Sequence, residues 1–318
     1  MADIEAQIDP DVRVNYTAER AEQLALIGPD MTEARARWSD LTVAWRRILP
    51  GFDGTEETAT IPGLGGDPDI AVRIYTANEI EFPYAVLIWA HGGGYVLGQA
   101  DDPFVYRYAP LMKVVSVEYR MAPEHRSPAA VRDVCAAIDW VAAHAAELGI
   151  DPARIIVGGP SGGGGVAAGA ALLNRDRGGP PLLYQMLIYP MIDDRHHFPS
   201  GHLDLPAYCW TREVSLRAWS LYVEEQGPSC YAAAIRADDV TGLPPAYIMT
   251  GDLDLFRDED IAYAKRLMGA GIRVDLAVFP GAPHGFDVVA PDARVSRRAV
   301  AHLLDCLRQV LSRPKELP

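Results

Sequence analysis

One stretch near the middle of the chain decides the expected fold, and it reads Ile155-Ile156-Val157-Gly158-Gly159-Pro160-Ser161-Gly162-Gly163-Gly164-Gly165-Val166. A buried-strand pattern runs into G-x-S-x-G at residues 159–163, and a helical pattern of Val, Ala and Leu follows. A serine at such a strand-to-helix turn sits on a sharp, strained bend, the nucleophile elbow. Gly159 and Gly163 fit this bend because side chains two residues either side of Ser161 would clash.

Alone, G-x-S-x-G is a weak pattern, and its context makes it informative. One alternative is a glycine-rich turn that merely packs, and another is a turn that cradles a phosphate. No Walker lysine follows the glycines, and their spacing is not that of a dinucleotide-binding fingerprint. The start of a helix directly behind Ser161 also favours developing negative charge. We therefore favour a nucleophilic serine.

Apolar runs on either side of this stretch alternate with helical patterns. Near-continuous apolar strands are typical of a parallel sheet that is covered on both faces. Alternation of strands with helices predicts a doubly wound α/β sheet, and with the elbow an α/β-hydrolase fold with a mostly parallel central sheet. The expected strands are residues 70–75, 84–90, 113–119, 154–159, 182–189, 246–251 and 273–279. The expected helices between and after them are residues 127–148, 261–271 and 300–311.

Two stretches do not follow the alternation. Residues 1–49 are helical in pattern, and residues 195–231 form an aromatic-rich insertion after a strand. An insertion at the carboxyl end of a strand lies on the ligand face of such a sheet. We interpret both stretches as a cap over the site. The expected division is residues 1–50 for the N-terminal part of the cap, 51–194 for the first part of the catalytic core, 195–233 for the cap insertion and 234–318 for the second part of the core.

A second glycine motif follows the strand at 84–90, and it reads Trp89-Ala90-His91-Gly92-Gly93-Gly94-Tyr95. Residues without side chains let backbone N–H groups converge on one point, which is what an oxyanion hole requires. We predict an oxyanion hole built on Gly92, Gly93 and Gly94 with Gly162, and we favour the N–H groups of Gly93, Gly94 and Gly162 as donors. We expect His91 to brace this loop rather than to transfer protons.

The acid and the base of such a site are expected after the serine in the chain, in the order acid, then histidine. The strand at 246–251 ends before Asp252 and Asp254, and reasoning from the residues alone leaves both open as the acid. His284 follows the next strand, in the loop Pro280-Gly281-Ala282-Pro283-His284-Gly285-Phe286. His284 would take the proton of Ser161, and the acid would hold the imidazole tautomer. This chemistry requires no metal and no cofactor.

Several stretches together resemble the bacterial hormone-sensitive-lipase-like esterases of the α/β-hydrolase superfamily. The resemblance covers residues 71–311 and adds an N-terminal cap segment. It places the catalytic acid at the first Asp of a D-x-x-R-D-E pattern, which selects Asp254 over Asp252. It also implies a preference for short acyl chains. The matching stretches are residues 91–95 (HGGGY), 118–125 (EYRMAPEH), 189–194 (YPMIDD), 254–259 (DLFRDE) and 283–286 (PHGF).

The elbow departs from the family pattern at two positions. Family elbows usually read Gly, then Asp, Glu or Thr, then Ser-Ala-Gly-Gly, whereas Pro160 precedes and Gly162 follows the serine here. Pro160 lacks an N–H and has a fixed φ, and it restricts Gly159 as well. Gly162 keeps its N–H, so the oxyanion hole is expected to survive, but its freedom is expected to loosen the elbow. We expect an active enzyme.

Composition excludes several classes of protein. The chain has 318 residues, of which 49% are hydrophobic and 23% charged, which is ordinary for a globular protein. A net charge of −14 argues against nucleic acid and against an anionic membrane surface. No apolar run is long enough for a membrane span, and residues 1–5 do not read as a secretory signal, so we expect a cytoplasmic protein. The four cysteines include no zinc-ligand spacing.

The expected function is hydrolysis of small carboxylic esters on a serine. Amide hydrolysis and acyl transfer stay open, because the same three residues serve them and the pocket selects the substrate. A non-catalytic receptor is disfavoured, since serine, acid and histidine are all present. A long-chain lipase is disfavoured, because no strongly amphipathic lid is evident. A homodimer that pairs at the strand 273–279 is possible. The expected pocket walls are Tyr95, Tyr189, Tyr208, Trp210 and Phe286.

Overall fold

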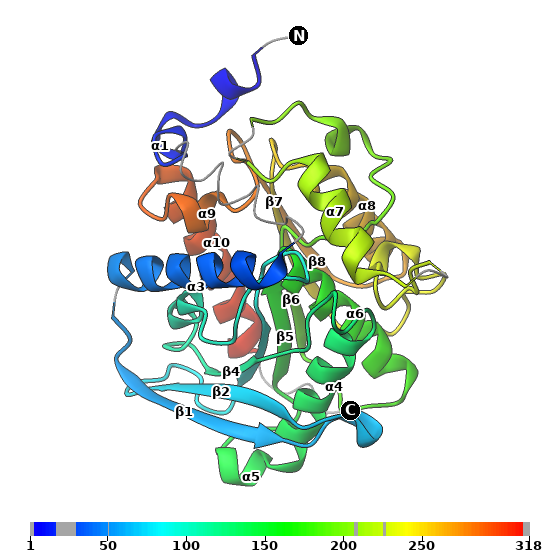
Figure 1. Cartoon of the computed structure of the whole chain (residues 1–318). Coiled ribbons are helices and arrows are strands. Elements are labelled where there is room, and N and C mark those ends of the chain that lie inside the picture. The colour runs from blue at the N-terminus through cyan, green and yellow to red at the C-terminus, as the bar shows by residue number, and fades with distance from the viewer. Residues whose placement is uncertain (1–2, 17–29, 50, 207–208, 225–226, 314–318) are drawn as a thin grey trace.

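The apolar segments of the middle of the chain lie side by side in one eight-stranded sheet (Figure 1). The computed structural model describes residues 3–16, 30–49, 51–206, 209–224 and 227–313. The strand order is β1-β2-β4-β3-β5-β6-β7-β8. The strands are β1 (Gly54–Ile61), β2 (Ile70–Ala77), β3 (Val86–Ala90), β4 (Lys113–Val117), β5 (Ile155–Pro160), β6 (Tyr184–Ile188), β7 (Ala246–Gly251) and β8 (Val274–Phe279).

Strands β3 to β8 are parallel, whereas β2 runs antiparallel to β4 and β1 antiparallel to β2. Val86 of β3 is in register with Lys113 of β4 on one side and with Ile155 of β5 on the other. Every residue of β3 and β6 is buried, because helices cover both faces of the sheet. The predicted α/β-hydrolase fold with a mostly parallel sheet is confirmed.

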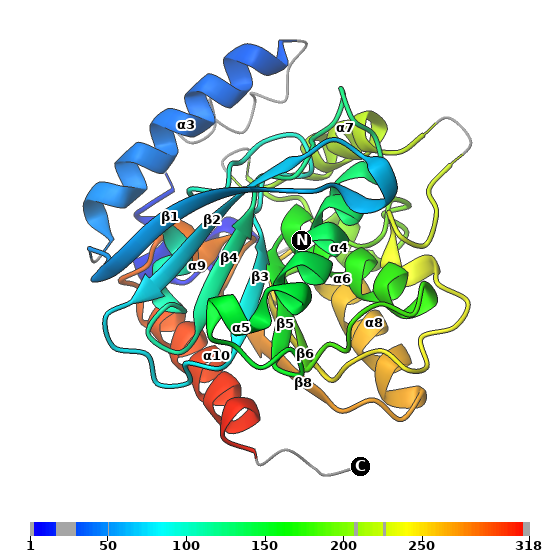
Figure 2. The same ribbon diagram turned by 90° about the horizontal axis from the view of Figure 1, so that it is seen from below.

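Helices pack on both faces of this sheet. Figure 2 shows α4, α6 and α8 on one side and α10 on the other, which is the arrangement expected of right-handed parallel crossovers. The α-helices are α1 (Pro10–Arg13), α3 (Met31–Ile48), α4 (Ala129–Ala143), α5 (Ala145–Leu148), α6 (Gly162–Asp176), α7 (Arg212–Tyr222), α8 (Arg257–Gly269), α9 (Phe286–Val289) and α10 (Arg294–Ser312).

Two of the differences between the structure and the sequence prediction concern a strand and the division of a helix. Strand β1 was not predicted, and most of its residues, in the sequence Gly-Thr-Glu-Glu-Thr-Ala-Thr-Ile, are exposed. It therefore lacks the apolar alternation by which half-buried strands are found. The single helix predicted at 127–148 is divided at His144 into α4 and α5, with Pro128 at the N-cap of α4. Neither difference alters the layers of the fold.

Helices α3 and α7 lie over one end of the sheet (Figure 1). Helix α3 belongs to the N-terminal stretch, and α7 belongs to the insertion at 195–233. Arg35 of α3 donates to the carbonyl oxygens of Val96 and Ala122 at 3.0 and 2.8 Å, which fixes the helix on the core. The division of the chain into cap and core at residues 50, 194 and 233 stays a prediction.

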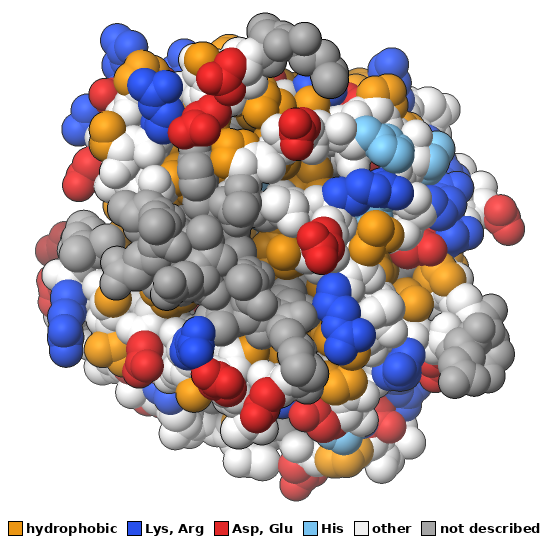
Figure 3. Space-filling view, turned by 45° about the horizontal axis from the view of Figure 1, so that its top comes forward, with side chains coloured by type: hydrophobic (Ala, Val, Ile, Leu, Met, Phe, Trp, Pro, Cys, Tyr) orange, Lys and Arg blue, Asp and Glu red, His pale blue; other side chains and the backbone are white. Residues whose placement is uncertain are grey.

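The molecular surface carries both charges. On the face shown in Figure 3, acidic and basic side chains are interspersed, and hydrophobic side chains lie exposed between them. Within the described residues, no helix has both the length and the apolar character needed to cross a bilayer. The excess of acidic residues is thus not gathered into a single patch on this face.

A buried ion pair joins α4 to the loop after β4. Asp133 is fully buried and accepts from the backbone N–H of Arg120 at 2.8 Å and from its guanidinium at 2.7 Å. Arg120 also pairs with Asp67 at 2.9 Å. On the same helix, Asp139 pairs with Arg177, but its side chain is 38% exposed.

We predict that Asp133→Ala lowers the free energy of unfolding by about 3 kcal/mol, because it leaves a half-buried guanidinium and a backbone N–H without their acceptor. The matched variant Asp139→Ala should cost about 1 kcal/mol or less, since exposed pairs contribute little. Chemical denaturation followed by circular dichroism measures both. Equal losses in the two variants would contradict this assignment.

Candidate active site

Ser161 lies between the end of β5 and the start of α6, in a backbone conformation that L-residues rarely adopt. Its φ is 57° and its ψ is −124°. The Ser161 N–H donates to the carbonyl of Ile188 at 2.9 Å, and the Ser161 carbonyl accepts from Gly165 and Met191, each at 3.0 Å. These three bonds hold the strained residue from both sides, which is how such strain persists in a folded chain.

Glycines allow the elbow to approach the end of β3. A Cβ atom at Gly159 would lie 2.2 Å from the carbonyl oxygen of Ala90, and one at Gly163 would lie 2.1 Å from the same atom. Any side chain at either position is therefore excluded. A Cβ at Gly162 would lie 2.9 Å from the backbone nitrogen of Gly94, so the start of α6 is packed directly on the second glycine motif.

Pro160, the unusual residue before the serine, ends β5 in register with Ile188 of β6 and lines the pocket described below. Pro160 has no N–H to donate to β6. The next residue, Ser161, donates to the Ile188 carbonyl instead, so β5 stays hydrogen-bonded to β6 at this end. Gly162, the unusual residue after the serine, is buried as the first residue of α6.

Ser161, His284 and Asp254 form one hydrogen-bonded series. The Oγ of Ser161 lies 2.9 Å from Nε2 of His284, and Nδ1 of His284 lies 2.8 Å from Oδ2 of Asp254. Ser161 and His284 are 8% and 7% exposed, whereas Asp254 is fully buried. The other Asp254 oxygen accepts from the Phe256 N–H at 2.9 Å. A carboxylate acceptor at Nδ1 makes that nitrogen the donor, so Nε2 is left to accept the serine proton.

Asp252 makes a different contact from Asp254. Its Oδ1 accepts from the backbone N–H of Gly281 at 2.7 Å, so it holds the loop that leads to His284. The N-terminal segment holds the same loop, because Asp9 donates its N–H to the Gly281 carbonyl at 2.8 Å. The Tyr16 hydroxyl also donates to the carbonyl of His284 at 3.1 Å. Two separate parts of the chain thus fix the path of the histidine loop.

The second glycine motif lies beside Ser161. Gly93 and Gly94 have φ values of 118° and 58°, which favour glycine. Within the described residues, neither of their N–H groups donates to a protein acceptor. Gly162 opens α6, and the first N–H groups of a helix have no intrahelical partner. Donors from the loop and the helix are thus available next to the serine, and Gly92 lines the pocket with Gly93.

His91 is held on several sides within this loop. Its ring stacks on Tyr119 at a centroid distance of 4.1 Å, and the Tyr119 hydroxyl donates to the His91 carbonyl at 2.7 Å. Nδ1 of His91 lies 2.9 Å from the carbonyl oxygen of Gly92. Burial lowers the pKa of His91, so the ring is neutral and Nδ1 donates to that carbonyl. His91 thus braces the glycine loop.

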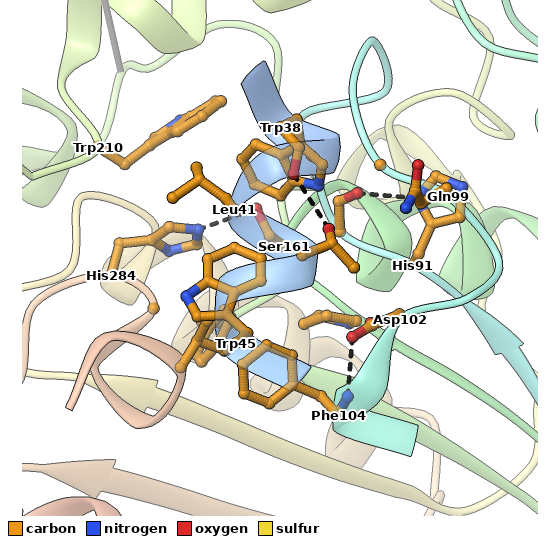
Figure 4. A pocket seen from close by; sticks show the side chains of 18 residues that line it. Trp38, Leu41, Trp45, His91, Gln99, Asp102, Phe104, Ser161, Trp210 and His284 are labelled. Atoms are coloured by element: carbon orange, nitrogen blue, oxygen red, sulfur yellow. Dashed lines mark hydrogen bonds between the residues drawn. The ribbon is translucent and has the colours of Figure 1, made fainter. Parts of the chain in front are cut away.

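A pocket with about 900 Å³ of empty space, counting its open mouth, leads to Ser161 and His284 (Figure 4). Its walls come from the serine and histidine loops, from the glycine loop and from α3. The lining residues are Trp38, Leu41, Thr42, Trp45, His91, Gly92, Gly93, Gly98, Gln99, Asp102, Phe104, Pro160, Ser161, Tyr189, Trp210, His284, Gly285 and Val288.

The structure places only some of the predicted pocket walls at this pocket. Tyr189 and Trp210 line it. Tyr95 lies behind it, where its ring stacks on Tyr222 of α7 at 3.9 Å and its hydroxyl donates to the Met191 carbonyl. Phe286 is fully buried behind Tyr189 and does not line the pocket. Tyr208 lies outside the described residues.

Tyr189 belongs to a buried polar network. Its hydroxyl donates to Oδ1 of Asp287 at 2.7 Å, and Arg107 pairs with Oδ2 of Asp287 at 2.8 Å. Burial, followed by the charge of Asp287, raises the pKa of Tyr189 well above its ordinary value, so the hydroxyl stays protonated and donates. The Tyr189 ring lies 4.8 Å from the His284 ring, edge to face. The network therefore supports one side of the imidazole.

Sequence reasoning missed the part of the pocket that α3 provides. Trp38, Leu41 and Trp45 line it, and their spacing of three and four residues places them on one face of the helix. That spacing was a usable signal, because residues 1–49 were already predicted to cover the site. Phe104 gave no such signal, because it lies in a short 3₁₀ helix at Pro103–Arg107.

Comparisons with known proteins agree with this geometry. Residues 87–288 match a family described by the α/β-hydrolase fold. The carboxylesterase NlhH of Mycobacterium tuberculosis is 37% identical over 287 residues, which cover 87% of this chain and 89% of NlhH. The carboxylic ester hydrolase LipN of the same organism is 34% identical, over 96% of this chain and 84% of LipN. A solved structure titled a bacterial heroin esterase is 41% identical, with a TM-score of 0.86 and coverage of 97% and 99%.

The matched region extends from β3 to β8 and includes the glycine loop, the elbow and the histidine loop. The relatives also extend well beyond it, over most of their own length and of this chain. The resemblance predicted from the sequence is therefore confirmed. This chain belongs to the α/β-hydrolase family, among the esterases that resemble hormone-sensitive lipase, and it is an ester hydrolase.

Proposed function

We propose that the chain hydrolyses short-chain acyl esters through an acyl-enzyme intermediate on Ser161. The observation that carries this proposal is the series Ser161–His284–Asp254, with distances of 2.9 and 2.8 Å, at the end of a mostly apolar pocket. The names of the relatives concern carboxylic esters and, in one structure, heroin. They support the ester bond as the reacting group of this chain's substrate.

Acylation begins with proton transfer from Ser161 to His284. Nε2 of His284 takes the Oγ proton as Oγ forms a bond to the ester carbonyl carbon. The carbonyl electron pair moves to oxygen, and the N–H groups of Gly93, Gly94 and Gly162 stabilise the resulting charge. One such donor typically contributes about 3–4 kcal/mol to stabilisation of the transition state. The start of α6 favours the same negative charge.

Collapse of the tetrahedral intermediate breaks the bond to the leaving alcohol. His284 returns the proton to that alcohol oxygen, and the acyl group stays on Ser161. Water then repeats the sequence: His284 takes a water proton, hydroxide oxygen bonds to the acyl carbon, and the proton returns to Ser161 Oγ as the acid leaves. Asp254 stays ionised throughout and stabilises the imidazolium.

The walls that α3 and Trp210 provide support small substrates. Helix α3 covers one side, and Trp210 of the insertion covers another, where a Cβ atom at Gly94 would meet its ring at 2.8 Å. A long acyl chain must therefore leave through the pocket mouth and gains little from added carbons. No lysine or arginine is among the described lining residues, so an uncharged ester fits the pocket better than an anionic one.

Pairing of two copies along β8 stays a prediction. Strand β8 is the last strand of the sheet and pairs with β7 on one side only. The outer edge of such a strand offers backbone N–H and C=O groups to a second chain. None of the reaction steps above depends on this pairing.

We predict that hydrolysis of p-nitrophenyl esters is fastest for the shortest members of a series from acetate to laurate, because α3 and Trp210 bound two sides of the pocket. Steady-state release of p-nitrophenol measures it. Ser161→Ala is the control and should lower kcat on the order of 10⁶-fold. A maximum at the long-chain end of the series, or undiminished activity in the control, would refute the proposal.

A second prediction distinguishes the two aspartates after β7. Asp254→Asn should lower kcat by about 10⁴-fold, because the amide no longer holds the Nδ1–H tautomer of His284. Asp252→Asn keeps an oxygen acceptor for the Gly281 N–H and should change kcat by about threefold or less, since it touches only the loop backbone. Comparable losses in both variants would show that Asp254 is not the specific partner of His284.

A further inference from the structure

Helix α3 brings two tryptophans to the pocket that contains Ser161. Trp38 and Trp45 lie seven positions apart, with Leu41 between them, and all three line the pocket (Figure 4). Both indoles are half-buried, although large aromatic side chains on a covering helix would normally be packed away from solvent. Because both line the pocket, part of each ring is available to a substrate there.

Phe104 extends this surface, and we call Trp38, Trp45 and Phe104 the aromatic wall. The Trp38 and Trp45 ring centroids are 5.6 Å apart with an interplanar angle of 84°. Those of Trp45 and Phe104 are 5.4 Å apart at 64°. Edge-to-face contacts of this kind fix the orientation of each ring. These contacts thus fix the orientation of the aromatic surface that the pocket offers to a substrate.

Contacts at both ends of α3 hold the wall in place. Near the start of the helix, Arg35 donates to the carbonyls of Val96 and Ala122. Near its end, Arg46 donates to the carbonyl oxygen of Asp101 at 2.6 Å and to its carboxylate at 2.8 Å. Asp101 lies next to Asp102, which itself lines the pocket. The tryptophan face is therefore tied to the core beside the glycine loop.

The charge of this region favours a neutral ring. Asp102 is the only carboxylate among the described lining residues, and both its oxygens are occupied. Oδ1 accepts from the Phe104 N–H at 2.9 Å, and Oδ2 accepts from the Trp89 indole at 3.1 Å. Burial raises the pKa of Asp102, and the two hydrogen bonds direct its oxygens away from a ligand in the pocket. Dispersion and ring-edge contacts remain as the means of recognition.

We propose that the aromatic wall binds the ring of an aromatic ester, so that this chain hydrolyses aromatic esters in preference to saturated-ring esters of equal size. The inference rests on the proposed function and names a substrate class for it. The shared chemistry is a flat, neutral ring joined to the ester, either in the alcohol part or in the acyl part. A ring in the alcohol part and a ring in the acyl part are tested with separate pairs of esters, and substitutions in the aromatic wall should affect one of these pairs.

The test compares each aromatic ester with its saturated counterpart. Phenyl acetate with cyclohexyl acetate probes a ring in the alcohol part, and ethyl benzoate with ethyl cyclohexanecarboxylate probes a ring in the acyl part. Intrinsic reactivity cancels when each ratio of kcat/KM is compared between wild type and variant. Trp45→Leu should lower the ratio for one pair by about three- to tenfold, the value of an aromatic pair contact. Trp45→Phe should retain most of it.

A matched tryptophan outside the pocket provides the control. Trp140 is half-buried on α4, where its ring stacks on His144 at 5.0 Å, and Trp140→Leu should leave both ratios unchanged. Unchanged ratios for both pairs in Trp45→Leu and in Phe104→Leu would overturn the inference. Equal loss with Trp45→Phe and Trp45→Leu would also overturn it, because the ring would then be irrelevant.

A binding experiment separates this inference from the proposed function. Calorimetric titration of Ser161→Ala protein with phenyl acetate and with cyclohexyl acetate, and with the benzoate pair, measures ring recognition without turnover. The inference is supported if one aromatic ester binds more tightly than its saturated counterpart and this difference is lost in Ser161→Ala/Trp45→Leu. That result would stand even if the wild type hydrolysed none of the four esters. Equal binding of the aromatic and saturated esters in both pairs would overturn the inference that the aromatic wall recognises a ring. It would not affect the proposal that Ser161 hydrolyses esters.

Discussion

Two backbone segments meet at the centre of the site: the elbow at Gly159–Gly163 and the end of β3 at Ala90. Their contact constrains every other part of the site. The Ala90 carbonyl oxygen lies where a Cβ of either glycine would be, so the segments meet with no side chain between them. That approach sets the left-handed conformation of Ser161 and presses the start of α6 against the glycine loop. In the proposed mechanism, the serine and the N–H groups that would stabilise the tetrahedral intermediate are thereby fixed relative to one another before any substrate binds.

The sequence allowed the core of this arrangement to be predicted because the core obeys local rules. Parallel strands buried on both faces read as apolar runs, and the elbow requires glycine at fixed offsets from Ser161. The acid was not decided by those rules, since Asp252 and Asp254 both follow β7, and the family resemblance was needed to choose between them. The structure separates the two by their partners, the Gly281 N–H for one and the His284 imidazole for the other.

What could not be predicted depends on contacts between segments that are far apart in the chain. Strand β1 has an exposed Thr and Glu pattern and is defined only by pairing with β2. The Arg107–Asp287 pair that supports Tyr189 joins residues 180 positions apart. Tyr95 was expected in the pocket, but its ring packs on Tyr222 of α7 instead. In the aromatic wall, Trp38 and Trp45 gave a usable helical spacing, whereas Phe104 gave none because it lies in a short 3₁₀ helix.

The central claim is that one strained, buried serine carries the acyl group, and covalent labelling tests it most directly. Wild-type protein is treated with an excess of a serine-directed phosphonate ester, and the product is analysed by intact mass and by peptide mapping. The account predicts one adduct per chain, on Ser161, and none when His284 is replaced by Ala. An adduct on another serine, or full labelling of Ser161 without His284, would contradict the account.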